Sequence, residues 1–269
     1  YIMPAARWGQ RMGDAQVVDA MTAALHDPFG HGHMGITAEN IAAKYGFTRE
    51  QQDAYALESH QRAQRAIDAG HFKSEIVPVE IKSRKGTVLF DTDEHLRRDL
   101  KIEDLQKLKA VFKKDGTVTA GNASGINDAA AAVVLMEAGE AKKQGAKPLA
   151  RLVAYSHAGV EPQLMGLGPI PAVQRLFKTC GLKPADMDVI ESNEAFAVQA
   201  MAVSRDLELD PAKVNVNGGA VALGHPIGAT GAILTVKALY ELQRVQKRYA
   251  LVTMCIGGGQ GIAAIFERI

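Results

Sequence analysis

From Leu149 to the C-terminus, short β-rich runs alternate with helical stretches, and this alternation constrains the fold more than any other feature of the chain. Such a rhythm is typical of a parallel or mixed sheet covered by crossover helices. The order of the runs predicts a βαβαβαββ domain of the α/β class. Its strands are expected near residues 149–156, 187–191, 213–217, 249–256 and 260–267, and its helices near residues 170–180, 195–207 and 229–243.

Residues 1–148 contain no comparable series of strands. A helix is expected over residues 37–44, and a capping box formed by Thr48 and Gln51 predicts a second one. The single candidate for a buried strand is the apolar run Ala129–Met136, which is unstable if it remains bare on both faces. We therefore expect the first half to be incomplete. The chain also opens without methionine or a leader, so its first residue is not expected to be the natural start.

Charge and cysteine content argue against several classes of protein. Lys plus Arg number 31 and Asp plus Glu 30, so the formal charge of +1 gives no global attraction to nucleic acid or an anionic membrane. No apolar run approaches the roughly 20 residues of a membrane span. Cys180 and Cys255 fit neither a disulfide scaffold nor a zinc spacing, which favours a reducing compartment. Half of the residues from 80 to 115 are charged, which indicates a solvated excursion and the best place for a polyphosphate contact.

Three motifs lie where strands of the second half are expected to end. Asn193 could hold a water or a carbonyl there, although this motif on its own fits a helix N-cap better. His225 lies among five glycines just before a helix, where few packing partners exist, and this favours a functional role. Cys255 precedes the glycine turn 257–259, whose backbone N–H groups lower a thiol pKa and stabilise an oxyanion. A buried, inert cysteine explains the last motif equally well.

Asn193, His225 and Cys255 end successive β-α units, so they are expected to converge at one edge of the sheet. A cysteine, a histidine, an asparagine and glycine-turn donors provide an acid or base, a polarising group and an oxyanion hole. These are the components for acyl transfer or carbon–carbon bond chemistry on thioesters. The glycine-rich segment around His225 is neither a P-loop nor a dinucleotide fingerprint.

A metal site is not expected. His26, His31 and His33 are close in the sequence, but no cysteine or carboxylate cluster completes a ligand set with a known spacing. The glycines between these histidines are equally well explained by turns.

Four motifs follow one another over nearly the whole chain. They are Gly121-Asn122-Ala123-Ser124-Gly125, Asn193-Glu194-Ala195-Phe196, Gly224-His225-Pro226-Ile227-Gly228 and Cys255-Ile256-Gly257-Gly258-Gly259. In sequence and order they resemble the thiolase family, and the chain is similar to bacterial short-chain β-ketothiolases of the acetyl-CoA acetyltransferase type. The resemblance implies a thiolase-like α/β fold, in which two βαβαβαββ halves stack and a loop domain is inserted in the first half. Residues 1–119 would be mainly loop domain with remnants of the N-terminal half at its edges, 120–148 the end of that half, and 149–269 the C-terminal half.

The resemblance also implies a reaction, namely condensation of two acetyl-CoA to acetoacetyl-CoA and the reverse thiolysis of short-chain 3-ketoacyl-CoA. Cys255 would exchange a proton with the α-carbon of acetyl-CoA. His225 would help to activate the acyl-accepting cysteine and would donate to the thioester oxygen, alongside a water held by Asn193. The Gly257 amide would contribute to a second oxyanion hole. Contacts with coenzyme A or the acyl group are expected from Leu25, His33, Met34, Arg97, Phe112, Ala120, Ser124, Met165, Ala195 and Phe196.

The partners implied by the resemblance are acyl-CoA substrates and further copies of the chain, in a homodimer or homotetramer. Coenzyme A would be a substrate and product, with no permanently bound cofactor and no bound metal. Neither nucleic acid nor a membrane is expected as a partner, and the expected location is the cytoplasm.

The chain departs from the family pattern at one point. Thiolases carry a nucleophilic cysteine on a glycine-rich segment of the first half, and no such motif is present. Cys180, followed by Gly181, fits the end of a helix and is expected to be structural. The chain is therefore expected to need an N-terminal segment for activity and to be inactive alone. The alternatives are a noncatalytic coenzyme-A-binding or interaction fragment, and a ketoacyl synthase, whose second active-site histidine is replaced here by Cys255.

Overall fold

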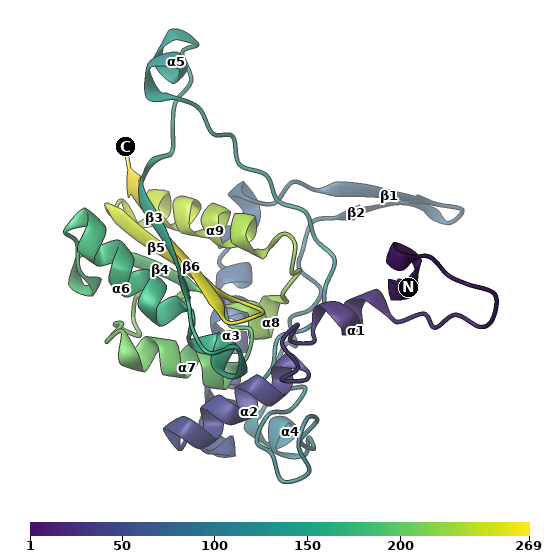
Figure 1. The fold of residues 1–269 in the computed structure, drawn as a ribbon. Helices are drawn as coiled ribbons and strands as arrows, with labels where there is room; N and C mark the ends of the chain where they lie inside the picture. The colour runs from purple at the N-terminus through teal and green to yellow at the C-terminus, as the bar shows by residue number, and fades with distance from the viewer.

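A four-stranded mixed sheet lies at the centre of the structure, a computed structural model that describes residues 1–269 (Figure 1). In spatial order its strands are β3 (Ala150–Gly159), β6 (Gln260–Arg268), β5 (Tyr249–Ile256) and β4 (Val189–Ser192). β4 and β5 pair in parallel, whereas β5 with β6 and β6 with β3 pair antiparallel. The mixed sheet predicted from the alternating runs is therefore confirmed.

Helices cover both faces of this sheet. α6 (Pro169–Cys180) and α7 (Ala197–Asp206) lie on one face, and α9 (Thr230–Val245) lies on the other (Figure 1). Consecutive side chains of β4 lie on opposite faces of the sheet. Ile190 packs in the core with α6 and α7, whereas Val189 packs with α9. A strand buried on both sides requires this two-residue alternation. The three predicted helices are confirmed, with small differences at their ends.

The prediction of a strand over residues 213–217 is wrong, because this segment forms no regular strand. One isolated parallel bridge joins this segment to Ile190. Extended pairing stops at Asn215, because its φ of 45° lies in the left-handed region. The Asn215 side chain continues the pairing instead, since it accepts from Ser192 N–H at 2.9 Å and donates to Ser192 O at 2.8 Å. A short helix that the sequence did not predict, α8 (Ala220–Leu223), follows.

Helix ends follow their capping signals. α3 (Arg49–Asp68) begins after Thr48, whose hydroxyl accepts from Gln51 N–H while the Gln51 side chain accepts from Thr48 N–H. The predicted capping box is therefore confirmed. α6 ends at Cys180, and Gly181 then adopts a φ of 73°, the left-handed conformation of a helix C-cap.

The first half of the chain forms helices and a hairpin but no second large sheet. Its remaining elements are the helices α1 (Ala20–Ala24), α2 (Met34–Tyr45), α4 (Ile102–Gln106) and α5 (Ala138–Lys143), the short 3-10 turns η1 (Pro4–Trp8) and η2 (His71–Ser74), and the strands β1 (Val79–Ser83) and β2 (Gly86–Phe90). Two more 3-10 turns, η3 (Pro162–Leu167) and η4 (Pro184–Asp186), lie in the second half. β1 and β2 form an exposed hairpin that projects from the body (Figure 1). The start of the charged segment is thus solvated as predicted, whereas α4 packs on α3 through the buried Leu105.

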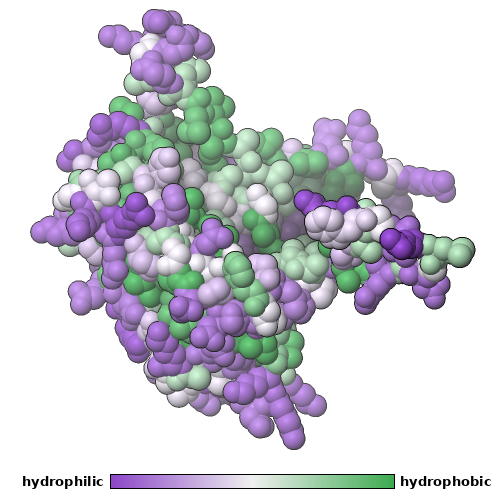
Figure 2. All heavy atoms as spheres, viewed as in Figure 1, coloured by the Kyte–Doolittle hydropathy of each residue, from purple (hydrophilic) through white to green (hydrophobic).

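The apolar run Ala129–Met136 forms no strand and leads from the body to α5 (Figure 1). Val134 and Leu135 within it are 88% and 79% exposed. In the same view, Figure 2 shows apolar atoms on the surface beneath α5. The expectation that this run finds no strand partner within the chain is confirmed. None of the helices combines the length and the apolar character of a membrane-crossing segment.

Candidate active site

Asn193 and His225 meet at the carboxyl end of β4. Asn193 directly follows this strand, and its backbone N–H donates to Thr253 O of β5 at 2.9 Å, so the sheet fixes its position. His225 follows α8, and its backbone N–H donates to Gly125 O at 3.0 Å. Asn193 Nδ2 and His225 Nε2 lie 3.4 Å apart. The Asn193 Oδ1 atom is buried without a protein donor, so it is available to a ligand.

The ring of His225 is also held from its other side. Its Nδ1 atom lies 2.7 Å from the hydroxyl of Thr230, the first residue of α9. Burial lowers the pKa of His225, because the charged ring loses its solvation. The ring is therefore mainly neutral at pH 7, the form that can accept a proton. Thr230 was not predicted from the sequence, and the available signal was a hydroxyl residue at a helix start just after the histidine.

Cys255 lies near the end of β5, opposite Gly261 of β6. Its side chain is 6% exposed and packs in an apolar cluster with Met165, Ala195 and Phe196. Burial raises the pKa of this thiol to about 12, and a backbone hydrogen bond that lowers the pKa has a smaller effect. The expectation that the glycine turn lowers this pKa is wrong, because desolvation outweighs the one backbone hydrogen bond, from Cys255 itself, that lowers it.

Aromatic side chains expected to contact coenzyme A gather beside this cluster. The rings of His33 and Phe112 stack with their centroids 4.8 Å apart, and Phe112 meets Phe196 edge-on at 6.2 Å. Ser124 donates to Ala195 O through both its backbone N–H, at 3.1 Å, and its hydroxyl, at 2.9 Å. The two motifs that supply Ser124 and Phe196 therefore lie against each other, although they are distant in sequence.

Met34 connects the first half of the chain to the glycine turn. Its backbone N–H donates to Leu25 O at 2.8 Å, and its side chain packs against the cluster that contains Cys255. The Met34 methyl group lies against Gly257, so any side chain at position 257 would collide with it. The structure thus gathers Leu25, Met34 and Gly257 in one place.

Arg97 and Ala120 lie outside this group. Arg97 lines an open groove of about 430 Å³ together with His60 and Lys101, and its backbone N–H donates to His60 Nδ1 at 3.4 Å. Burial, together with the positive charges of His95 and Arg97, lowers the pKa of His60 to about 4. Ala120 is exposed. No hydrogen bond or aromatic contact connects Arg97 or Ala120 to His33, Phe112 or Phe196.

The side chain of Glu194, which is 1% exposed, was also not predicted as part of the site. Its carboxylate accepts from Tyr55 Oη at 3.2 Å, Ser59 Oγ at 2.7 Å, Asn215 Nδ2 at 2.9 Å and Val221 N–H at 3.1 Å. These donors come from α3, α8 and the segment between α7 and α8. Glu194 thereby anchors the Asn193 motif to three other parts of the fold. A carboxylate directly after a buried strand was the available signal, but its donors were not identifiable from spacing.

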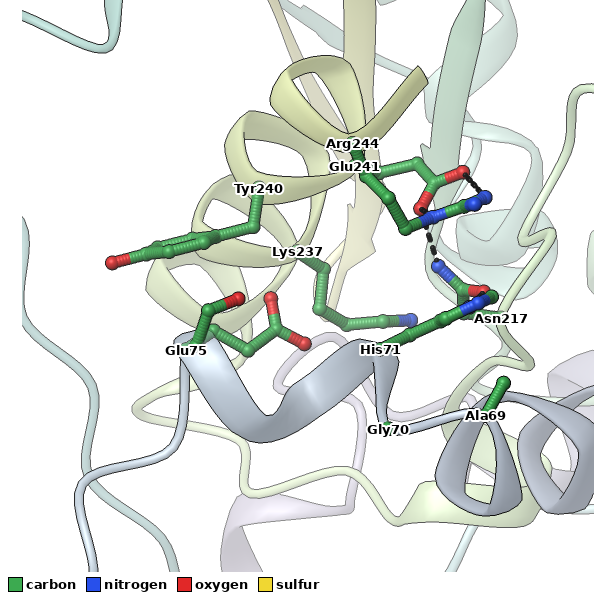
Figure 3. A pocket seen from close by; sticks show the side chains of 10 residues that line it. Ala69, Gly70, His71, Glu75, Asn217, Lys237, Tyr240, Glu241 and Arg244 are labelled. Atoms are coloured by element: carbon green, nitrogen blue, oxygen red, sulfur yellow. Dashed lines mark hydrogen bonds and ion pairs between the residues drawn. The ribbon is translucent and has the colours of Figure 1, made fainter.

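A separate pocket of about 280 Å³ lies between η2 and α9 (Figure 3). Lys237 of α9 is buried there and donates to Glu191 Oε2 at 2.9 Å and to Gly218 O at 2.7 Å. Figure 3 shows Glu75 facing Lys237. Burial raises the pKa of Glu75 to about 7, although the charge of Lys237 opposes this shift. None of the residues predicted for catalysis or coenzyme A binding lines this pocket.

The histidine-rich loop has structural contacts of its own. His33 Nδ1 accepts from Gly35 N–H at 3.0 Å and so caps α2, and His26 Nδ1 contacts Thr22 O at 2.7 Å. The rings of His26 and His33 meet edge-on, with centroids 5.4 Å apart. No group of three or more His, Cys, Asp or Glu side chains in the structure is arranged to hold a metal ion.

Two family models match the chain. The model described as "Thiolase, N-terminal domain" matches residues 1–139, and the model described as "Thiolase, C-terminal domain" matches residues 146–268. Over 270 aligned residues the chain is 67% identical to the beta-ketothiolase BktB of Cupriavidus necator. This alignment covers 100% of the chain and 68% of that protein.

Solved structures match over the same extent. The acetyl-CoA acetyltransferase of Bacillus anthracis superposes with a TM-score of 0.95 at 48% identity, covering 100% of this chain and 68% of that one. The human mitochondrial 3-ketoacyl-CoA thiolase in complex with CoA superposes with a TM-score of 0.90 at 45% identity, covering 100% and 67%. The fold described above is therefore shared along the whole length of this chain.

Proposed function

Since the chain belongs to the thiolase family, we propose that it transfers acyl groups between coenzyme A thioesters as a short-chain acetyl-CoA acetyltransferase. The reaction is the condensation of two acetyl-CoA to acetoacetyl-CoA and the reverse thiolysis of short-chain 3-ketoacyl-CoA. The observation that carries this proposal is the contact between Asn193 and His225 at the carboxyl end of β4. Thioester chemistry needs a polarising pair of this kind beside a group that exchanges protons.

Cys255 exchanges that proton in the proposed mechanism. At rest its thiol is neutral because burial raises its pKa to about 12, so it can give a proton to the carbanion formed during thiolysis. The thiolate left behind is a strong base for the same reason, and it can take a proton from an attacking thiol or from the α-carbon of acetyl-CoA. The raised pKa of Cys255 therefore supports both directions of the reaction, in which this side chain alternates between thiol and thiolate.

His225 and Asn193 act on the thioester oxygen. The neutral ring of His225 first takes the proton of the acyl-accepting thiol, and Nε2–H then donates to the oxygen where negative charge develops. Asn193 supports this through a water held by its side chain, and the Gly257 amide contributes to a second oxyanion hole. The stack of His33 on Phe112 provides the apolar wall beside the coenzyme A chain.

The proposal includes a component that the 269 residues do not supply. Neither Cys180, at the end of α6, nor Cys255, on β5, lies on a glycine-rich segment of the first half. We propose that an N-terminal segment carries the nucleophilic cysteine and that the chain alone forms no acyl-enzyme. The complete protein, meaning this sequence together with that segment, is proposed to act in the cytoplasm as a homodimer or homotetramer.

The test replaces Cys255 in the complete protein. Cys255→Ala is expected to abolish both condensation and thiolysis, by at least about 100-fold, because general acid–base catalysis is lost. Binding of coenzyme A, measured by calorimetry, is expected to stay within about twofold. Cys180→Ala is the matched control and is expected to keep wild-type turnover. Near-normal turnover of Cys255→Ala would remove this thiol from the mechanism, and a wild-type protein that binds coenzyme A without turnover would favour the noncatalytic alternative.

A further inference from the structure

His225 is held between two side chains. On one side Nδ1 lies 2.7 Å from Thr230 Oγ1, and on the other Nε2 lies 3.4 Å from Asn193 Nδ2. Thr230 is 3% exposed, and its hydroxyl also lies 2.9 Å from Pro226 O, to which it can donate. No other hydrogen bond holds the ring, so its orientation depends on this pair.

A hydroxyl group has one proton and two acceptor positions, and this permits two arrangements. When Thr230 donates to Pro226 O, its oxygen accepts from Nδ1–H and Nε2 carries a free lone pair. When Thr230 donates to Nδ1 instead, Nε2 carries the hydrogen. Pro226 O keeps the N–H groups of Ala229, at 2.8 Å, and of Thr230, at 2.9 Å, in either case. Both neutral forms of His225 therefore have a partner at Nδ1. At Nε2, Asn193 Nδ2 can donate only to the form that carries the lone pair there, so Nδ1–H is the resting form.

We propose that Thr230 is a positioning residue that directs Nε2 of His225 toward Asn193 and allows the ring both neutral tautomers. This inference rests on the proposed function, in which His225 performs two consecutive tasks. The lone pair of Nε2 first takes the thiol proton, which leaves a thiolate and an imidazolium whose Nδ1–H donates to Thr230. Nε2–H then donates to the thioester oxygen. A carboxylate in place of the hydroxyl would favour Nδ1–H alone.

The surroundings of His225 leave the Thr230 oxygen as the acceptor at Nδ1 when the ring becomes charged. Burial is the only cause of the lowered pKa of His225, with no charged neighbour contributing. His95, another titratable ring, lies against Gly125, whose carbonyl accepts from the His225 N–H, and burial lowers the pKa of His95 as well. No other group replaces the Thr230 oxygen as acceptor for the charged ring. Loss of the hydroxyl therefore lowers the pKa of His225 further.

The test uses Thr230→Val and Thr230→Ser in the complete protein. For Thr230→Val, kcat of thiolysis is expected to fall on the order of tenfold or more, because removing the partner that orients a metal-binding histidine has an effect of this size and the same loss of orientation applies here. KM is expected to stay within about twofold, and the acidic limb of the pH profile of kcat/KM to move to lower pH. Thr230→Ser keeps the hydroxyl and is expected to restore both kcat and the profile.

Thr235→Val is the matched control. Thr235 lies on the same helix, and its hydroxyl donates to Gly231 O at 2.8 Å, four residues earlier, as that of Thr230 does toward Pro226. It contacts no histidine through a hydrogen bond. This variant is expected to keep wild-type kcat, KM and pH profile, so a general effect of a lost helix hydroxyl is measured separately.

Three results would overturn the inference: a wild-type kcat and pH profile in Thr230→Val, a change confined to KM, or a Thr230→Ser variant that does not recover. Crystal structures of the wild type, Thr230→Val and Thr235→Val test the positioning without turnover. A ring displaced from Asn193 in Thr230→Val alone supports it, and an unmoved ring contradicts it. If the wild type has no thiolase activity, the proposed function fails, and the crystal structures still decide the role of Thr230.

Discussion

At the scale of single residues, burial acts in opposite directions on the two titratable groups of the candidate site and has one shared result. It raises the pKa of Cys255 to about 12 and lowers the pKa of His225. Both side chains are therefore neutral at rest. Charge appears at the site only when a proton moves, which suits a reaction that begins and ends with neutral thioesters.

The raised pKa of Cys255 predicts its reactivity. Iodoacetamide at pH 8 is expected to modify Cys180 at least about tenfold faster than Cys255, because the thiolate is the reactive form and Cys180 is only half-buried. Timed quenching and peptide mass spectrometry give the two rates. In denaturant the rates are expected to become equal, which serves as the control. Faster labelling of Cys255 in the folded protein would contradict the assigned burial.

The sequence predicted the site residues that combine a reactive side chain with a position at the end of a predicted element. Residues that belong to the site only through their contacts were not predicted. Asn193 follows a predicted strand and His225 precedes a predicted helix, so their meeting at one sheet edge could be expected from topology. Glu194 receives its shortest hydrogen bond from Ser59, 135 positions away, and no local pattern announces such a pairing. Thr230 was likewise recognisable only once the His225 ring had an orientation.

At the scale of elements, local capping signals predicted helix boundaries well, and the four strands of the central sheet were predicted, whereas the paired strands β1 and β2 were not. The segment at 213–217 failed because one positive φ, at Asn215, ends the pairing, and composition does not report a single dihedral angle. The run Ala129–Met136 has the composition of a strand without forming one. Strand formation needs a neighbour as well as a suitable sequence.

The capping box of α3 gives a prediction at this scale. Thr48→Ala removes the acceptor for Gln51 N–H and is expected to lower the free energy of unfolding by about 1 kcal/mol. Urea unfolding followed by circular dichroism measures the change. Thr87→Ala, on the exposed strand β2, is the control and is expected to alter stability by less than about 0.5 kcal/mol. An unchanged midpoint for Thr48→Ala would mean that this cap does not limit the stability of α3.

At the scale of the whole molecule, the pocket between η2 and α9 joins the first half of the chain to the second through charged groups. Glu75 comes from the first half, whereas Lys237, Glu191 and Glu241 come from the second. Asp93, from the first half, adds a further carboxylate whose pKa burial also raises. The packing of the two halves therefore depends on the protonation of this pocket.

Glu75 makes that dependence testable. Its pKa rises from 4.5 to about 7 because burial favours the protonated form, so its contribution to stability is present below pH 4.5 and is lost as the pH rises through 7. Glu75→Gln is expected to lose less stability than the wild type between pH 5 and pH 8, measured by thermal melting. Glu80→Gln, on the exposed strand β1, is expected to follow the wild type. Parallel curves for the wild type and Glu75→Gln would refute the role of Glu75.

The buried pair of Lys237 and Glu191 restricts how this protein can change over generations. Removing one partner of such a pair leaves a buried charge and costs about 3–5 kcal/mol, whereas replacing both with apolar residues of similar volume is often neutral. Two acceptable states are therefore separated by an unstable intermediate. A lineage that drifts by single substitutions is expected to retain both residues, even though neither takes part in the proposed chemistry. Retention of Lys237 and Glu191 would then reflect the instability of the single-substitution intermediate and not a role in catalysis.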